Sequence, residues 1–218
     1  MTRWRIIFDY DDTLIRHDND KELQIMLDYL GLEATEDIKA ELINYYTKLA
    51  KHFKKSKVKR KDVDLYMYEI LPILNYHGIS IERFMEAQQY KDTHYSMLME
   101  DVIDVLEYLK SKNYYMCIFT NGFYEEQAYS LKAQGIYDYF DRIFGWDDFY
   151  AKPDKRAFIR ALSGTKPEEN IMVGNCIEND IAPAKELGIY TFGFNLNNKS
   201  IVMPDVELKS LSELKCYL

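Results

Sequence analysis

The sequence predicts an α/β fold in which a bundle of helices is inserted into a parallel-sheet domain. Short apolar runs alternate with amphipathic helical patterns from residue 98 onward, and one further apolar run lies near the N-terminus. This alternation is typical of parallel strands joined by crossover helices. Residues 20–97 break it and carry one helical pattern after another. With 218 residues, 47% of them hydrophobic, the chain can bury a sizeable core without staples.

Four apolar runs are predicted as strands of the sheet. Each is short and almost uninterrupted, as expected for a parallel strand that is buried on both faces. They are residues 5–8, 114–119, 171–173 and 189–194. Stripes with helical spacing separate the later runs, at residues 102–109, 128–132, 157–162 and 181–187. The sheet domain is therefore predicted to comprise residues 1–15 and 98–218.

Residues 16–97 are predicted to form a separate domain of four amphipathic helices. The stripes lie at residues 23–30, 38–53, 63–74 and 81–85. Thr35 is a candidate N-cap for the second helix, and the fourth follows Ser80. Pro72 is expected to kink the third helix, because proline removes an intrahelical hydrogen bond. Four helices in about 80 residues suit a small bundle inserted between two strands.

Composition and charge exclude several classes of protein. The net charge of −8 argues against binding of nucleic acid by the whole surface. No apolar run approaches the ~20 residues of a membrane span. The three cysteines form no CxxC pair, which favours neither disulfides nor a zinc cluster. With no secretory signal at the N-terminus, the reducing cytoplasm is the expected compartment. The oligomeric state is left open.

Residues Lys51 to Lys61 depart from this acidic balance. The segment has seven Lys and Arg residues and no acid. Its simplest interpretation is a solvated loop between two helices, and the alternative is an attractive patch for an anionic substrate.

The first predicted strand runs directly into an acidic cluster that contains Asp9 and Asp11. In open α/β sheets ligands bind at the carboxyl ends of strands, so chemistry is expected at this point. Two carboxylates two residues apart can converge on one substrate atom, and clustered acids favour Mg²⁺. Taken alone, the DxDxT pattern is equally compatible with an Asx turn at the surface.

Three further features follow the later strands and make the combination specific. Thr120-Asn121-Gly122 ends the second strand with a hydroxyl and flexible backbone amides. Lys152 precedes a helix, and residues 174–180 after the third strand are rich in polar groups suited to a metal. Each feature alone is also compatible with an ordinary turn or a solvated side chain.

These motifs resemble those of the haloacid dehalogenase-like superfamily. DYDDTL resembles its first motif, FTNG its second, AKP its third and VGNCIENDIAPAK its fourth. The resemblance extends over residues 1–15 and about 98–195, and the inserted helices resemble the C1 cap of the family. It implies a Rossmann-like sheet core and a cap that closes over the site.

The resemblance also implies a mechanism, namely hydrolysis of a small phosphorylated metabolite through an aspartyl-phosphate. Asp9 would be the nucleophile. Asp11 would protonate the leaving oxygen and then activate water. Thr120 and Asn121 would bind the phosphate, and Lys152 would neutralise its charge. A phosphatase is expected rather than a hydrolytic dehalogenase, because dehalogenating members lack the second acid, and halide needs no protonation.

The implied cofactor is Mg²⁺, bound by Asp9, by the backbone carbonyl of Asp11, and by Asn175 and Asp180 of the fourth motif. Asn175 departs from the family pattern, which has Asp at this position. An amide oxygen can bind Mg²⁺ but contributes no charge, so weaker binding is expected. The alternative is a catalytically weak or inactive protein that binds phosphorylated ligands. A receiver domain of a signalling protein is disfavoured, since it has no helical insert.

Two residues near these motifs receive structural interpretations. His17 is the only one of the four histidines close to the motifs in sequence, and it is interpreted as a surface residue. Cys176 lies inside the fourth motif without an adjacent base and is interpreted as packing.

Overall fold

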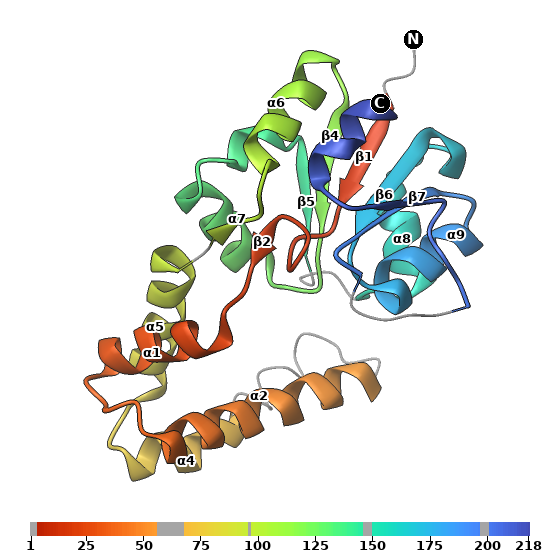
Figure 1. Cartoon of the computed structure of the whole chain (residues 1–218). Helices are drawn as coiled ribbons and strands as arrows, with labels where there is room; N and C mark the ends of the chain where they lie inside the picture. Colours follow the sequence, from red (N-terminus) through yellow and green to blue (C-terminus); the bar gives the residue numbers. More distant parts are fainter. Residues whose placement is uncertain (1–3, 56–67, 96, 146–149, 197–200) are drawn as a thin grey trace. The chain divides into compact units, whose positions relative to one another are not determined.

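The computed structural model describes residues 4–55, 68–95, 97–145, 150–196 and 201–218 (Figure 1). The chain forms two compact units. The sheet unit comprises Met1–His17 and Met97–Leu218, and the helical unit comprises Asp18–Ser96. The predicted α/β class is confirmed.

The sheet unit is built on six parallel strands in the order β5-β4-β1-β6-β7-β8. The four inner strands are those predicted from apolar runs: β1 (Arg5–Phe8), β4 (Tyr115–Phe119), β6 (Asn170–Gly174) and β7 (Tyr190–Phe194). The two edge strands, β5 (Arg142–Phe144) and β8 (Val206–Leu208), were not predicted. A separate antiparallel pair joins β2 (Ile15–Arg16) to β3 (Met97–Leu98).

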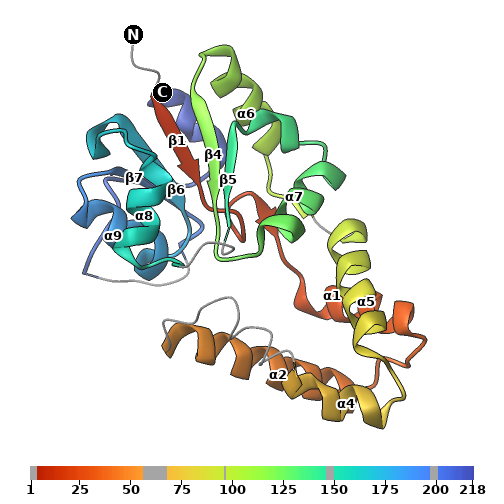
Figure 2. The same ribbon diagram turned by 180° about the vertical axis from the view of Figure 1, so that it is seen from behind.

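Helices cover both faces of this sheet (Figures 1 and 2). One face packs against α6 (Val102–Ser111), α7 (Tyr124–Ala133) and the 3₁₀ helix η5 (Leu211–Cys216). The other packs against α8 (Lys155–Leu162) and α9 (Ala182–Glu186). Short turns of helix complete the unit: η2 (Tyr137–Tyr139), η3 (Pro167–Glu169) and the π-helical η4 (Ile177–Ile181). Ile6 and Phe8 point to the first face and Ile7 to the second, so after Arg5 the strand is apolar on both faces.

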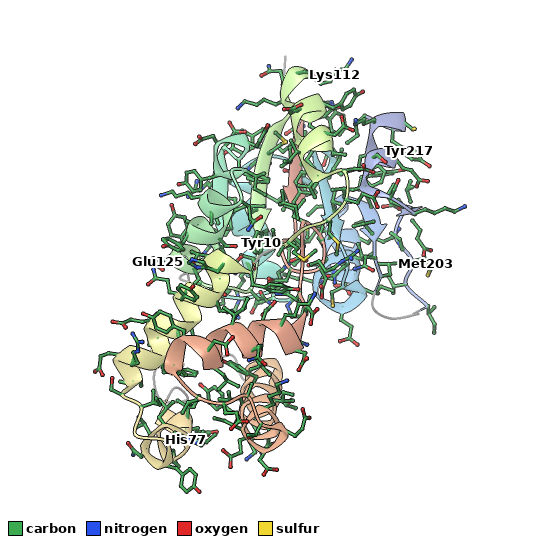
Figure 3. The ribbon with its side chains drawn as sticks, turned by 60° about the vertical axis from the view of Figure 1, so that its left-hand side comes forward. Tyr10, His77, Lys112, Glu125, Met203 and Tyr217 are labelled. Carbon is green, nitrogen blue, oxygen red and sulfur yellow. The ribbon has the colours of Figure 1, made fainter. Side chains whose placement is uncertain are left out.

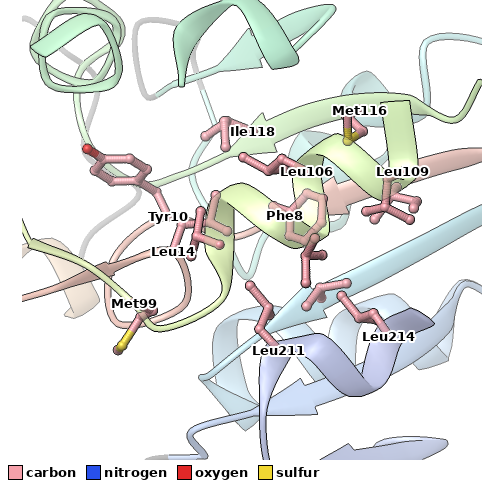
Figure 4. Close-up of a cluster of buried hydrophobic side chains, with 14 of the residues drawn as sticks. Phe8, Tyr10, Leu14, Met99, Leu106, Leu109, Met116, Ile118, Leu211 and Leu214 are labelled. Atoms are coloured by element: carbon pink, nitrogen blue, oxygen red, sulfur yellow. The ribbon is translucent and has the colours of Figure 1, made fainter. Parts of the chain in front are cut away.

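The loop after β1 is anchored in the core of the first face. Tyr10 is 2% exposed and lies at one end of the buried cluster, beside Leu14 (Figure 4). Its hydroxyl donates to Oγ of Ser130, at 2.6 Å. Its carbonyl accepts from the backbone of Leu14 and Ile15 at 2.9 and 3.2 Å. The side chains on either side of Tyr10 are therefore held on a rigid turn.

The helical unit has its own hydrophobic core. Its described elements are α1 (Asn19–Leu30), α2 (Glu36–Lys55), the 3₁₀ turn η1 (Tyr68–Ile70), α4 (Leu71–Tyr76) and α5 (Ile81–His94). The hydroxyls of Thr35 and Ser80 accept from the backbone of Ile38 and Arg83, so the expected cap at Thr35 is confirmed. Within the described ranges, no helix is both long and apolar enough to cross a membrane.

Two expectations for the helical unit need correction. Pro72 does not kink a helix, because it lies in the first turn of α4, where its missing N–H has no intrahelical acceptor to lose. Residues 63–67 of the predicted third helix lie outside the described residues. Of the basic segment, residues 51–55 belong to α2 rather than to a loop. Residues 56–61 are also outside the described residues.

Candidate active site

Three neighbouring strands of the sheet unit end at polar residues. β1 lies between β4 and β6, and the strands are followed by Asp9, Thr120 and Asn175, respectively. All three residues are buried, with exposures of 6%, 2% and 7%. The backbone N–H of Asp9 donates to the carbonyl of Val173 at 2.8 Å, which extends the pairing of β1 with β6 by one residue. Parallel pairing therefore brings the first, second and fourth sequence motifs to one edge of the sheet.

Lys152 joins two of these motifs through its ammonium group. Nζ lies 2.5 Å from Oδ1 of Asp9 and 2.6 Å from Oδ1 of Asp180. The side chains of all three residues are less than a tenth exposed. The cluster thus has two carboxylates and one ammonium in a region of low dielectric, and it bears a net negative charge when fully ionised.

This arrangement shifts the pKa values of Asp9 and Lys152. Burial raises the pKa of Asp9 above its ordinary value, and the charge of Asp180 raises it further, against the opposing effect of Lys152. Burial acts to lower the pKa of Lys152, but the two carboxylates outweigh it and raise that pKa. Lys152 is therefore held as a cation, and the site favours an additional positive charge or a proton next to Asp9.

Asp180 is positioned by a tight turn after β6. The residue is fully buried, and its Oδ2 accepts from the backbone N–H of Cys176 at 3.0 Å. The turn requires glycine at position 174, because a Cβ there would lie 2.6 Å from Oδ2 of Asp180. Both carboxylate oxygens of Asp180 have protein partners, so its sequence-derived role as a metal ligand remains a prediction.

Thr120 and Asn121 are the residues predicted to bind phosphate. The Thr120 hydroxyl accepts from the backbone N–H of Gly122 at 3.0 Å. The Asn121 amide makes two hydrogen bonds with the backbone of Lys152, donating to its carbonyl at 3.0 Å and accepting from its N–H at 2.8 Å. Asn121 therefore attaches the Lys152 segment to the end of β4, and phosphate binding by these residues stays a prediction.

Thr13 is a site residue for which the sequence motifs predicted no role. Its hydroxyl donates to Oδ2 of Asp9 at 3.0 Å, and the side chain is fully buried. The two oxygens of Asp9 thus have different partners, Thr13 at Oδ2 and Lys152 at Oδ1. The T of the DxDxT pattern was an available signal for this contact.

Asp11 is more exposed than the buried cluster, although its charge helps to raise the pKa of Asp9, and it is paired with His17. Nε2 of His17 is 2.9 Å from Oδ1 of Asp11, and the two side chains are 33% and 47% exposed, respectively. The interpretation of His17 as a plain surface residue is therefore incomplete. No spacing rule would have found this pair, because the turn around Tyr10 and strand β2 bring the two residues together (Figure 3 shows Tyr10 inside the unit).

The donor set is compatible with Mg²⁺ that is bound only partly by protein. Among the described residues, no three or more His, Cys, Asp and Glu side chains form a group that could hold a metal ion. Mg²⁺ usually takes one or two carboxylates and completes its shell with water and phosphate oxygens. Asn175 is 7% exposed, and its amide has no hydrogen-bond partner in the described chain, so its oxygen is available as a ligand. The excess negative charge beside Asp9 also favours a cation.

The model of the haloacid dehalogenase-like hydrolases matches residues 5–188. The chain belongs to this family. The sequence motifs that indicated it are those now found at the ends of β1, β4 and β6 and at Lys152.

Similar proteins include two archaeal enzymes named glyceraldehyde 3-phosphate phosphatase. The one from Methanocaldococcus jannaschii is 28% identical over an alignment of 230 positions, gaps included, which covers 96% of this chain and 94% of that enzyme. The one from Methanothermobacter thermautotrophicus is 38% identical over 84 residues, so the match spans only 37% of each chain. The crystal structure of the HAD-hydrolase YfnB from Bacillus subtilis, bound to magnesium, has a TM-score of 0.76 at 22% identity and covers 100% of this chain and 99% of its own. At that identity the likeness shows the fold alone.

Proposed function

We propose that this haloacid dehalogenase-like hydrolase is a phosphatase that hydrolyses a small phosphomonoester through an aspartyl-phosphate on Asp9. The observation that carries the proposal is the buried carboxylate of Asp9, held between Lys152 and Thr13 at the end of β1. A carboxylate fixed in this way can attack phosphorus while the ammonium offsets the charge of the phosphate. The names of the two archaeal relatives support a small sugar phosphate as substrate.

The first step transfers the phosphoryl group to the enzyme. An oxygen of Asp9 forms a bond to phosphorus as the ester P–O bond breaks, and Asp11 gives its proton to the leaving alcohol oxygen. Lys152 stabilises the charge that accumulates on the phosphoryl oxygens. Thr120 has a hydroxyl hydrogen with no acceptor in the described chain, so it can donate to one of those oxygens.

The second step regenerates the enzyme. Asp11, now ionised, takes a proton from a water molecule that attacks phosphorus, and the bond between Asp9 and phosphorus breaks. The products are inorganic phosphate and the starting carboxylate. The site would hold Mg²⁺ through Asp9, the carbonyl of Asp11 and the amide oxygen of Asn175, with Asp180 acting directly or through water. When bound, the cation reduces the repulsion between the carboxylate and the phosphate ester.

The helical unit is proposed to act as the cap that selects the organic part of the substrate and excludes water during transfer. The cytoplasm is proposed as the compartment, because three cysteines without a CxxC pair suggest no disulfide framework.

The test is a phosphatase screen over a panel of small phosphate esters, with Mg²⁺ titrated from zero to millimolar concentrations. Release of inorganic phosphate by the wild type, and none by Asp9→Asn, is expected. Asp11→Asn should still be phosphorylated by p-nitrophenyl phosphate, because nitrophenolate leaves without protonation, and mass spectrometry should then find one phosphoryl group on the peptide with Asp9. Phosphate release equal in wild type and Asp9→Asn would reject the proposal.

Asn175 favours a second candidate, a protein that binds phosphorylated ligands with little or no turnover. The amide provides an oxygen but removes one negative charge from the metal site. Asn175→Asp separates the two candidates: for an active phosphatase, it should lower the Mg²⁺ concentration needed for half-maximal activity. A wild type that binds phosphate esters by calorimetry and releases no phosphate at any Mg²⁺ concentration would support the binder.

A further inference from the structure

The pair formed by His17 and Asp11 is unlike the other contacts of the site. Asp9, Lys152 and Asp180 are almost fully buried, whereas the side chain of Asp11 is 47% exposed. A half-exposed carboxylate ordinarily rotates freely about its side-chain bonds. Here the imidazole of His17 holds Oδ1 at 2.9 Å.

The contact leaves the second oxygen of Asp11 available. Oδ2 has no hydrogen-bond partner in the described part of the chain. One oxygen is therefore fixed by the protein, while the other can face a substrate. This is the division that a proton-transferring carboxylate requires, because its reactive oxygen must lie within hydrogen-bond reach of the leaving group.

Stability is a poor explanation for this pair. Contacts between partly exposed polar side chains contribute little to stability, because water competes for them and the side chains lose conformational freedom. Orientation is a different matter, since a displacement of about 1 Å of a catalytic group can reduce the rate by roughly 100-fold. The contact also joins the loop after β1 to the residue at the end of the sheet unit's first segment.

We propose that His17 is a positioning residue for Asp11, which it orients so that the free oxygen delivers the proton to the leaving alcohol. This inference rests on the proposed phosphatase function. His17 itself does not touch the substrate; it acts by restricting the rotamers of Asp11. Its loss should therefore affect the reaction most where protonation of the leaving group matters most.

The first experiment compares kcat/KM for an alkyl phosphate and for p-nitrophenyl phosphate in His17→Phe and His17→Gln. His17→Phe should lower the value for the alkyl ester about 10-fold and for the aryl ester less than about 3-fold, because the aryl leaving group needs little protonation. Gln retains an N–H donor of similar reach and should restore most of the activity. His77→Phe is the matched control, since His77 also faces a carboxylate, that of Glu41 at 3.9 Å, in the helical unit.

A double-mutant cycle gives the second readout. In an Asp11→Asn background, His17→Phe should cause no further loss on the alkyl ester, because the group that it positions is already gone. An additive loss, an equal loss on both esters or a gain in activity would overturn the proposal. A gain would mean that His17 holds Asp11 away from the reaction.

A third measurement does not depend on turnover. The ring ¹⁵N resonances of His17 in the metal-free protein, at one fixed pH, should move in Asp11→Asn, while those of His77 should not. Unchanged His17 resonances would show that the contact is absent and would overturn the inference even if the enzyme is a phosphatase. A wild type no more active than Asp9→Asn would reject the proposed function, and the catalytic role of His17 with it.

Discussion

Replacing Lys152 by methionine tests the electrostatics of the buried cluster directly. The substitution keeps the unbranched apolar stem of the side chain but removes the ammonium that lies between Asp9 and Asp180. Two adjacent carboxylates would then be buried without a cation. Removing one partner of a buried ion pair costs roughly 3–5 kcal/mol, because the remaining charge is uncompensated. Lys152→Met should therefore be destabilised by an amount in this range when both acids are ionised.

The loss should depend on pH with a defined sign. Burial raises the pKa of Asp9 to about 7 in the wild type, and the variant loses the opposing effect of Lys152, so its value lies higher still. A carboxyl group whose pKa is raised on folding stabilises the protein below the unfolded pKa of about 3.9, and this contribution is lost as pH rises through the folded pKa. The difference between variant and wild type should thus be small near pH 4, begin to grow at about pH 7 and reach its full size only above the higher pKa of Asp9 in the variant.

Urea unfolding of the metal-free protein at several pH values measures the effect. Lys155→Met is the control, because Lys155 pairs with Glu186 at 2.8 Å but both side chains are more than half exposed. Lys152→Met/Asp180→Asn should recover part of the loss, since it removes one of the two buried charges. A Lys152→Met protein as stable as Lys155→Met at high pH, or equally destabilised at all pH values, would refute this reasoning.

Three further changes have expected outcomes of their own. Gly174→Ala should reduce phosphatase activity by at least about 10-fold, because the new Cβ displaces Asp180. Overpacking of this kind costs about 1–3 kcal/mol. Retention of full activity would contradict the close contact between position 174 and Asp180. Asp205→Asn should destabilise the protein near neutral pH, since hydrogen bonds from Lys185 and from the backbone of β7 outweigh burial and lower the pKa of Asp205. The difference in stability between variant and wild type should vanish when the pH falls below that pKa. A difference in thermal unfolding that stays constant with pH would argue against this. Arg5→Met should lower the free energy of unfolding in urea by roughly 1.5–3 kcal/mol, because the guanidinium donates to the last carbonyls of α8. A change within experimental error would show that these hydrogen bonds do not stabilise the fold.

The inner strands of the sheet were predictable because a strand buried on both faces has a nearly continuous apolar run in the sequence. β1 has apolar side chains on both sides of the sheet, so its run is almost unbroken. The edge strands have no such apolar run. β5 and β8 have three residues each and include Arg142 and Glu207, and their pairing depends on the neighbouring strand rather than on their own composition.

The candidate site likewise has some contacts that could be predicted from the sequence and others that could not. Asp9, Thr120 and Asn175 directly follow strands, and a parallel sheet brings strand ends together whatever the intervening chain does. The contact of Lys152 with Asp180 depends on a π-helical turn that residue spacing does not reveal. The contact of His17 with Asp11 likewise depends on an antiparallel pair whose strands are two residues long and far apart in the sequence.

The short edge strands have a consequence for how copies of this protein behave at high concentration. An exposed strand border offers unpaired N–H and C=O groups to any other extended chain, and long apolar borders invite fibre formation. Here each border is three residues long, with Arg142 on one and Glu207 on the other. A foreign strand could form only a few hydrogen bonds before meeting a charge, so the sheet is protected against unwanted growth from either side.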